Sequence, residues 1–113
     1  MTRCAVIAVA VALAAGCGGT GPRSAASLRD CVHDRLPKGA VDRITSSTVE
    51  GVTTITYAHR GSETTVSVFA SQDDAKRAEL AEARLGDAHD RRVGNVLYSG
   101  GGAAEAAIAA CLR

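Results

Sequence analysis

An uncharged apolar run close to the N-terminus limits what this chain can fold into. The run extends from Cys4 to Ala15 and follows a single basic residue, Arg3. A helix that spans a bilayer needs about 20 consecutive apolar residues, so this run is too short for a permanent membrane span. Its length and its basic flank are typical of a signal peptide that is removed. About 80 residues then remain for a folded core, and a domain of that size often needs a covalent cross-link.

The end of the apolar run carries a recognisable motif. Residues 13–17 read Leu-Ala-Ala-Gly-Cys, which resembles the lipobox of bacterial lipoprotein precursors. The family more often has leucine three residues before the cysteine, where this chain has Ala14, and Leu13 stands one residue earlier. The resemblance implies that residues 1–16 are a signal peptide, cut after the small residue Gly16. It also implies that the thiol of Cys17 receives a diacylglyceryl group, which would hold the mature chain on the outer face of a cell membrane.

An ordinary secretory signal is the alternative to the lipobox. Cleavage near Ala14 would leave three cysteines in the exported chain, and an odd thiol is a liability in an oxidising compartment. If the lipobox is used, Cys4 leaves with the signal peptide and Cys17 is alkylated. Cys31 and Cys111 then remain as a pair. The cysteine count therefore favours the lipobox.

The segment after Cys17 is rich in glycine and leads into a helical pattern. Residues 17–26 are expected to include the lipidated cysteine and a flexible tether, and residues 27–113 to form the folded domain. Ser27 is the expected cap of a first helix, which Pro37 and Gly39 end. Apolar side chains recur along this helix at helical spacing, at Leu28, Cys31, Val32 and Leu36.

Residues 41–70 are rich in threonine and valine, as is typical of β-strands. Two interruptions, at Glu50-Gly51 and at residues 59–62, indicate turns. We therefore expect three antiparallel strands over residues 41–49, 52–59 and 63–70. Threonines and serines blur the alternation in the first of these strands, so its buried face stays open.

The remainder of the chain predicts two helices and one further strand. Ser71 is the expected cap of the second helix, and acidic residues follow it in the first turn, where the helix dipole favours them. A fourth strand is expected over residues 93–99, and a last helix over 103–112 after the glycine run 100–102. The stripe expected to face the sheet from the second helix comprises Ala75, Ala78, Ala81 and Leu85. The order α-β-β-β-α-β-α predicts an α+β domain with its helices on one face of a four-stranded antiparallel sheet.

Cys31 and Cys111 both fall on apolar stripes of their helices. We expect these two helices to pack side by side and to be joined by a disulfide. Two buried free cysteines are the alternative, and an exported chain favours the disulfide. The bond would close a loop of about 80 residues, which contributes roughly 4–5 kcal/mol in the chain-entropy account.

No constellation of residues indicates catalysis or metal binding. The three histidines, His33, His59 and His89, lie far apart in the sequence, and neither a His-x-His nor a Cys-x-x-Cys spacing occurs. Ser99 precedes the glycine run, yet the sequence contains neither a nucleophile-elbow pattern nor a Walker pattern. We therefore expect solvated histidines, and no catalytic, cofactor-binding or metal-binding residue.

Charge and composition narrow the choice of partners. The 13 basic and 12 acidic residues almost cancel, which gives no reason to expect nucleic acid. Aromatic residues make up 3% of the chain, so stacking platforms for bases or sugars are not expected. Large apolar residues are also few, which makes a roomy lipid-carrying cavity difficult to build.

Two functions from different classes remain. The arginine-rich, lysine-poor chain resembles small lipoproteins of high-GC Gram-positive bacteria, specifically over residues 1–17 and only generally afterwards. The first hypothesis is a membrane-anchored, non-enzymatic binding or assembly module whose partner is an envelope protein, a polymer or a small ligand. The rival is a small envelope hydrolase assembled from scattered residues. A pocket that holds His59 or His89 against a serine or carboxylate favours the hydrolase, whereas an exposed apolar patch on the uncovered face of the sheet favours the binding module.

Overall fold

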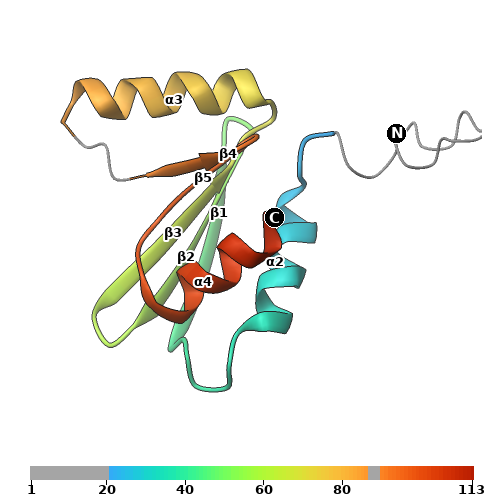
Figure 1. Cartoon of the computed structure of the whole chain (residues 1–113), viewed down its shortest axis with the longest axis vertical. Helices are drawn as coiled ribbons and strands as arrows, with labels where there is room; N and C mark the ends of the chain where they lie inside the picture. Colours follow the sequence, from blue (N-terminus) through green and yellow to red (C-terminus); the bar gives the residue numbers. More distant parts are fainter. Residues whose placement is uncertain (1–20, 87–89) are drawn as a thin grey trace, which may run out of the picture.

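A computed structural model describes residues 21–86 and 90–113 of the chain. The described part is a small α+β domain with three helices and a five-stranded antiparallel sheet, in the strand order β1-β2-β3-β5-β4 (Figure 1). The predicted signal peptide, Cys17 and the first part of the predicted tether lie outside the described residues. The elements are α2 (Ala25–Arg35), β1 (Arg43–Val49), β2 (Val52–His59), β3 (Ser62–Val68), α3 (Gln72–Arg84), β4 (Arg91–Val93), β5 (Val96–Ser99) and α4 (Gly102–Cys111).

The first three strands form a meander joined by two-residue turns. Glu50 and Gly51 have φ values of 51° and 81°, and Arg60 and Gly61 have φ values of 52° and 83°. Two successive left-handed residues define a type I′ turn, whose twist matches that of the strands on either side. The three strands predicted over residues 41–70 are confirmed, and their ends move by two residues at most.

The prediction of a single fourth strand over residues 93–99 is wrong. This segment is a hairpin in which Val93 pairs with Val96 across the turn Gly94-Asn95, so the sheet has five strands instead of four. Gly94 has φ of +60°, as the first position of a type II′ turn requires. The sequence signal was available, since glycine followed by asparagine between two valines is a recognised hairpin dipeptide.

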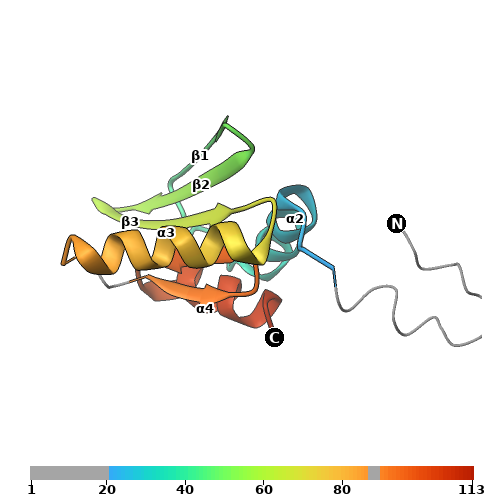
Figure 2. The same ribbon diagram turned by 90° about the horizontal axis from the view of Figure 1, so that it is seen from above.

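One face of the sheet carries the main core, and α2 and α4 cover that face side by side (Figures 1 and 2). The sulfur atoms of Cys31 in α2 and Cys111 in α4 form a disulfide, with the two Cα atoms 6.0 Å apart. The predicted pairing of these helices is thereby confirmed. The strands contribute Ile55, Tyr57, Val66, Val68, Val96 and Tyr98 to this core, and α4 contributes Ala104, Ala107 and Ile108.

Helix α3 does not join α2 and α4. It packs against β4 and β5, where Leu97 and Ala75 are buried. Side chains alternate along a strand, so Leu97 points away from the face that Val96 and Tyr98 share. The expected placement of every helix on one face therefore holds for α2 and α4 only. The predicted stripe on α3 also fails at its end, because Leu85 is 83% exposed.

The N-terminal boundary of the domain lies earlier than predicted. Helix α2 begins at Ala25, and the cap is Ser24, whose hydroxyl accepts a hydrogen bond from Ser27 N at 3.0 Å. Arg23 is already fixed, since its N–H donates to Asn95 Oδ1 at 2.9 Å and its carbonyl accepts from Asn95 Nδ2 at 3.0 Å. The part of the predicted tether from Arg23 onward thus belongs to the folded domain.

Candidate functional site

The best candidate site is a cavity of about 390 Å³ at the end of the β2–β3 hairpin. Cavities of this size are large enough for a small ligand. The sheet contributes Tyr57, His59, Ser62 and Thr64 to its wall. The loop before β1 and the first turn of α4 close the other sides, through residues 40–41 and 101–104.

The first turn of α4 lines this cavity. Gly101 is the N-cap, and no side chain accepts a hydrogen bond from the helix start. The first N–H groups of a helix have no partner within the helix and form its positive end. The wall at this point therefore suits a hydrogen-bond acceptor.

Close packing of the strand against the glycine run sets the position of this helix start. The Thr64 hydroxyl donates to Gly101 O at 3.1 Å. Gly100 has φ of +131°, and a Cβ atom there would lie 2.5 Å from Thr64 Oγ1 and 2.6 Å from Thr64 Cα. Glycine is therefore required at residue 100, because any side chain would push α4 off the sheet.

Tyr57 forms part of the cavity wall and carries an unpaired hydroxyl. The residue is 2% exposed, and its Oη has no hydrogen-bond partner among the described residues. Its ring meets the ring of His33 edge to face, with the centroids 6.0 Å apart. Burial raises the pKa of Tyr57 above its ordinary value of 10.0.

A carboxylate, a histidine and a serine gather at the mouth of the cavity. His59 Nδ1 lies 3.4 Å from Asp42 Oδ1, and His59 stands opposite Ser62 in the register of β2 and β3. The backbone N–H of Arg60 donates to Asp42 Oδ2 at 2.8 Å and holds the pKa of Asp42 below its ordinary value of 3.8. The sequence did not reveal this grouping, although the two-residue turn Arg60-Gly61 places His59 and Ser62 opposite each other.

The three side chains do not form a hydrogen-bonded relay. His59 Nδ1 lies 3.4 Å from Asp42 Oδ1 and has no hydrogen-bond partner among the described residues. Within residues 21–86 and 90–113, no hydrogen bond joins the side chains of His59 and Ser62. A nucleophilic serine needs a base within hydrogen-bonding reach and a third group that orients the base. Here Asp42 lies beside His59, but no side-chain hydrogen bond joins His59 to Ser62 among the described residues.

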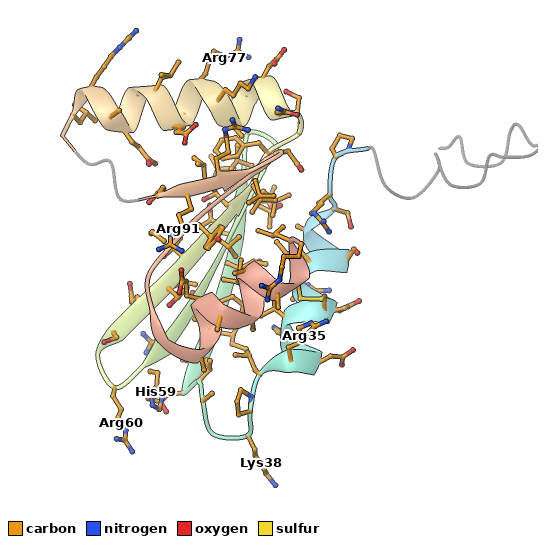
Figure 3. The ribbon with its side chains drawn as sticks, viewed as in Figure 1. Arg35, Lys38, His59, Arg60, Arg77 and Arg91 are labelled. Carbon is orange, nitrogen blue, oxygen red and sulfur yellow. A yellow bond between two sulfur atoms is a disulfide. The ribbon has the colours of Figure 1, made fainter. Side chains whose placement is uncertain are left out.

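The charged side chains around this end of the domain point outward. Figure 3 shows the side chains of Arg60 and Lys38 extending away from the body of the domain. Arg60 nevertheless lines the mouth of the cavity, together with His59, whereas Lys38 does not.

A second surface feature lies at the opposite edge of the sheet from β4. All seven residues of β1 are exposed, including Ile44 at 42% and Val49 at 65%. Strand β1 pairs with β2 on one side only, so its other side carries unpaired backbone groups. Ile44 and Val49 are five residues apart and therefore lie on opposite faces of the strand, so they do not form one apolar patch.

The predicted site residues have mixed outcomes. Cys31 and Cys111 form the expected disulfide, whereas Cys17 and His89 lie outside the described residues. His33 is exposed on α2. Across residues 21–86 and 90–113, no three histidine, cysteine or acidic side chains are grouped as a metal site. In the same residues, no helix has the length and apolar character to cross a membrane.

Comparison with known proteins gives no guide to function: no protein family, no curated protein and no solved structure matches this chain.

Proposed function

We propose that this chain is an envelope lipoprotein, anchored by lipid on Cys17 to the outer face of a cell membrane, with a non-enzymatic binding or assembly module as its folded domain. The proposal has two parts, the cellular location of the protein and the role of its folded domain. Each part has separate support and a separate test.

The disulfide supports the proposed location outside the cytoplasm. A bond between Cys31 and Cys111 is typical of a chain that folds outside the reducing cytoplasm. It leaves Cys17 as the cysteine available for lipid once a signal peptide that contains Cys4 is removed. A Cys17→Ala variant should carry no lipid, and it should either accumulate as a precursor that keeps its signal peptide or be cleaved elsewhere and released from the membrane. A variant that remains processed and membrane-bound would contradict the anchor.

The exposed strand β1 carries the proposed role. Monomeric proteins usually shield a sheet edge, because an open edge invites another strand to pair with it. Here a complete seven-residue edge with two large apolar side chains stays uncovered. A domain with this edge is suited to association with a partner. Protection of the β1 amides from hydrogen exchange on the membrane, relative to the monomeric chain at high dilution, is the expected sign of that association.

The grouping of Asp42, His59 and Ser62 favours one rival function, a small hydrolase. The described structure has no side-chain hydrogen bond from His59 to Ser62 that would activate the serine, so we place this candidate second. A fluorophosphonate probe, which labels activated serines, distinguishes the two. We expect no labelling of Ser62. Labelling that is lost in His59→Ala would establish the hydrolase and overturn the non-enzymatic role.

A further inference from the structure

We infer that the cavity beside the first turn of α4 binds a monocarboxylate with a short aliphatic body, either the C-terminal end of a peptide that ends in small residues or a free short-chain acid. The inference rests on the proposed binding role and adds to it a ligand site distinct from strand β1. Three features of the cavity support this choice of ligand. They are an uncapped helix start, an unpaired buried hydroxyl, and a lining of small apolar side chains without an acidic residue.

The start of α4 has free hydrogen-bond donors and lies in the cavity wall. Residues 101–104, which are the N-cap and the first residues of the helix, all line the cavity. Within the described part of the chain, no side chain caps this helix and no backbone carbonyl accepts from the N–H groups of residues 102–104. The first N–H groups of a helix are its positive end and bind anions readily. A carboxylate complements this part of the wall.

Tyr57 points to a ligand independently of the helix. It lines the cavity and is 2% exposed, and its hydroxyl has no hydrogen-bond partner among the described residues. Its side chain leaves β2 on the face that α2 and α4 cover, so the hydroxyl extends toward the layer in which the cavity lies. Buried polar groups in folded proteins are nearly always hydrogen-bonded. A carboxylate in the cavity would accept from this hydroxyl. His59 Nδ1 is also buried and unpaired, but it faces Asp42 at 3.4 Å, so we assign it no ligand contact.

The charge around the cavity fits a ligand with one negative charge. Among the described residues of the lining, Arg60 alone carries a permanent charge, and none is acidic. Asp42 lies just outside the lining, beside His59 and the backbone N–H of Arg60, and offsets part of the positive charge. The helix start adds roughly half an elementary charge. The total is small and positive, which complements a carboxylate better than a doubly charged phosphate.

The rest of the wall sets the size and polarity of the ligand. Its side chains are short and apolar, from Ala40, Val41, Ala103 and Ala104. The volume of about 390 Å³ lies near the lower end of the range of small-molecule sites, roughly 300–1,000 Å³. One or two short aliphatic groups attached to the carboxylate therefore fit, as in a peptide end or a short-chain acid.

The test is a titration of the isotope-labelled mature lipoprotein, with its anchor, in detergent micelles, followed through the amide NMR signals of residues 102–104. The probes are N-acetyl-Ala-Ala, butyrate, and N-acetyl-Ala-Ala amide, which has the same body and no charge. We expect the dipeptide acid to shift these signals and to bind about 10-fold more tightly than the amide, because hydrogen bonds to charged groups are the stronger ones. Butyrate that binds as tightly as the dipeptide acid identifies a free acid as the ligand, and weaker binding of butyrate identifies a peptide end.

Paired variants locate the site. Tyr57→Phe removes only the hydroxyl and should lower the affinity for N-acetyl-Ala-Ala about 10-fold or more. Tyr98→Phe is the matched control and should leave the affinity unchanged, because Tyr98 is buried in the same core but does not line the cavity. Arg60→Gln should weaken binding by at most about 5-fold, the usual size of an exposed charge interaction. Lys38→Gln, at a residue outside the lining, should have no effect.

Three results would overturn the inference: equal binding of the dipeptide acid and its amide, equal losses in Tyr57→Phe and Tyr98→Phe, or unshifted amides of residues 102–104 at about 10 mM probe. Each of them would leave the proposed binding role in place, since the protection of the β1 amides tests that role separately. Release of free alanine from the dipeptide that stops in Ser62→Ala would instead establish the hydrolase, and it would overturn the role together with the inference.

Discussion

The disulfide between α2 and α4 offers the most quantitative test of the fold. The bond joins Cys31 and Cys111, which are 80 residues apart in sequence, so it constrains almost the whole described domain in the unfolded state. In the chain-entropy account a closed loop of this length removes about 15 cal/mol/K of unfolded-state entropy, or about 4.5 kcal/mol at 25 °C. For a domain of this size, 1 kcal/mol corresponds to roughly 4–8 °C in the midpoint of thermal unfolding. The double variant Cys31→Ala/Cys111→Ala should therefore melt roughly 20–35 °C below the parent.

Circular dichroism of the full chain in mild detergent, with and without reductant, measures this effect. Cys111 is 8% exposed and packs in the core, so its replacement also removes some apolar contact. Reduction of the parent protein separates the two contributions, because it breaks the bond and keeps both side chains. The double variant should be insensitive to reductant. A parent protein whose melting temperature falls by less than about 5 °C on reduction would refute the argument that the bond is a main source of stability.

Three further predictions concern the core and the cavity. Asn95→Asp removes the side-chain N–H groups that donate to Arg23 O and to the backbone carbonyl of residue 69; denaturant titration should show a loss of about 2–4 kcal/mol, because buried acceptors are left unpaired. Gly100→Ala, which meets Thr64 directly, should cost about 3 kcal/mol by the same measurement, and Gly101→Ala, which meets open space, less than about 1 kcal/mol; equal losses would contradict the close packing. Tyr57→Phe should raise stability by about 1 kcal/mol, because it removes an unpaired buried hydroxyl. The raised pKa of Tyr57 means that the unfolded chain ionises first, so the parent should lose stability as the pH rises above 10, and Tyr57→Phe should reduce that loss; an unchanged alkaline profile would contradict the burial of this hydroxyl.

Most helices and strands could be predicted from the sequence because the periodicity of apolar residues matches the side of each element that is buried in the fold. The apolar stripe from Ala104 to Cys111 lies on the core side of its helix. Ile55 and Tyr57, two residues apart in one strand, lie on the core face of the sheet. The two Gly-containing turns placed the meander correctly, since a left-handed residue pair fits few other structures. In these segments the periodicity of the sequence and the burial of side chains identify the same face.

The predictions that were wrong concern segments in which a short turn or cap motif lies beside a longer apolar pattern. Residues 93–99 read as one strand because valines flank the turn Gly94-Asn95 on both sides. The sequence predicts Ser27 as the helix cap, whereas the cap is Ser24. The helix begins earlier because Asn95, which is distant in sequence, binds the backbone of Arg23. Small residues along α3 indicated a buried stripe, yet that helix contacts only the narrow β4–β5 end of the sheet.

The candidate site was beyond the reach of the sequence for a different reason. Asp42, His59 and Ser62 come from separate elements, and only the strand register brings them together. The exposure of β1 was hidden because threonines and serines make its two faces alike. On the sheet face turned away from α2 and α4, β2 and β3 also carry hydroxyl side chains that align across strands, as in the contact of 3.2 Å between Thr54 Oγ1 and Ser67 Oγ.

The central claim is that Cys17 carries the lipid that anchors this domain. The most direct measurement is the intact mass of the mature protein extracted from membranes, together with the mass of its N-terminal peptide. The account predicts a chain that begins at Cys17 and carries a diacylglyceryl group on that residue, with Cys31 and Cys111 oxidised. An unlipidated chain that begins near Ala15, with the thiol of Cys17 free, would contradict it.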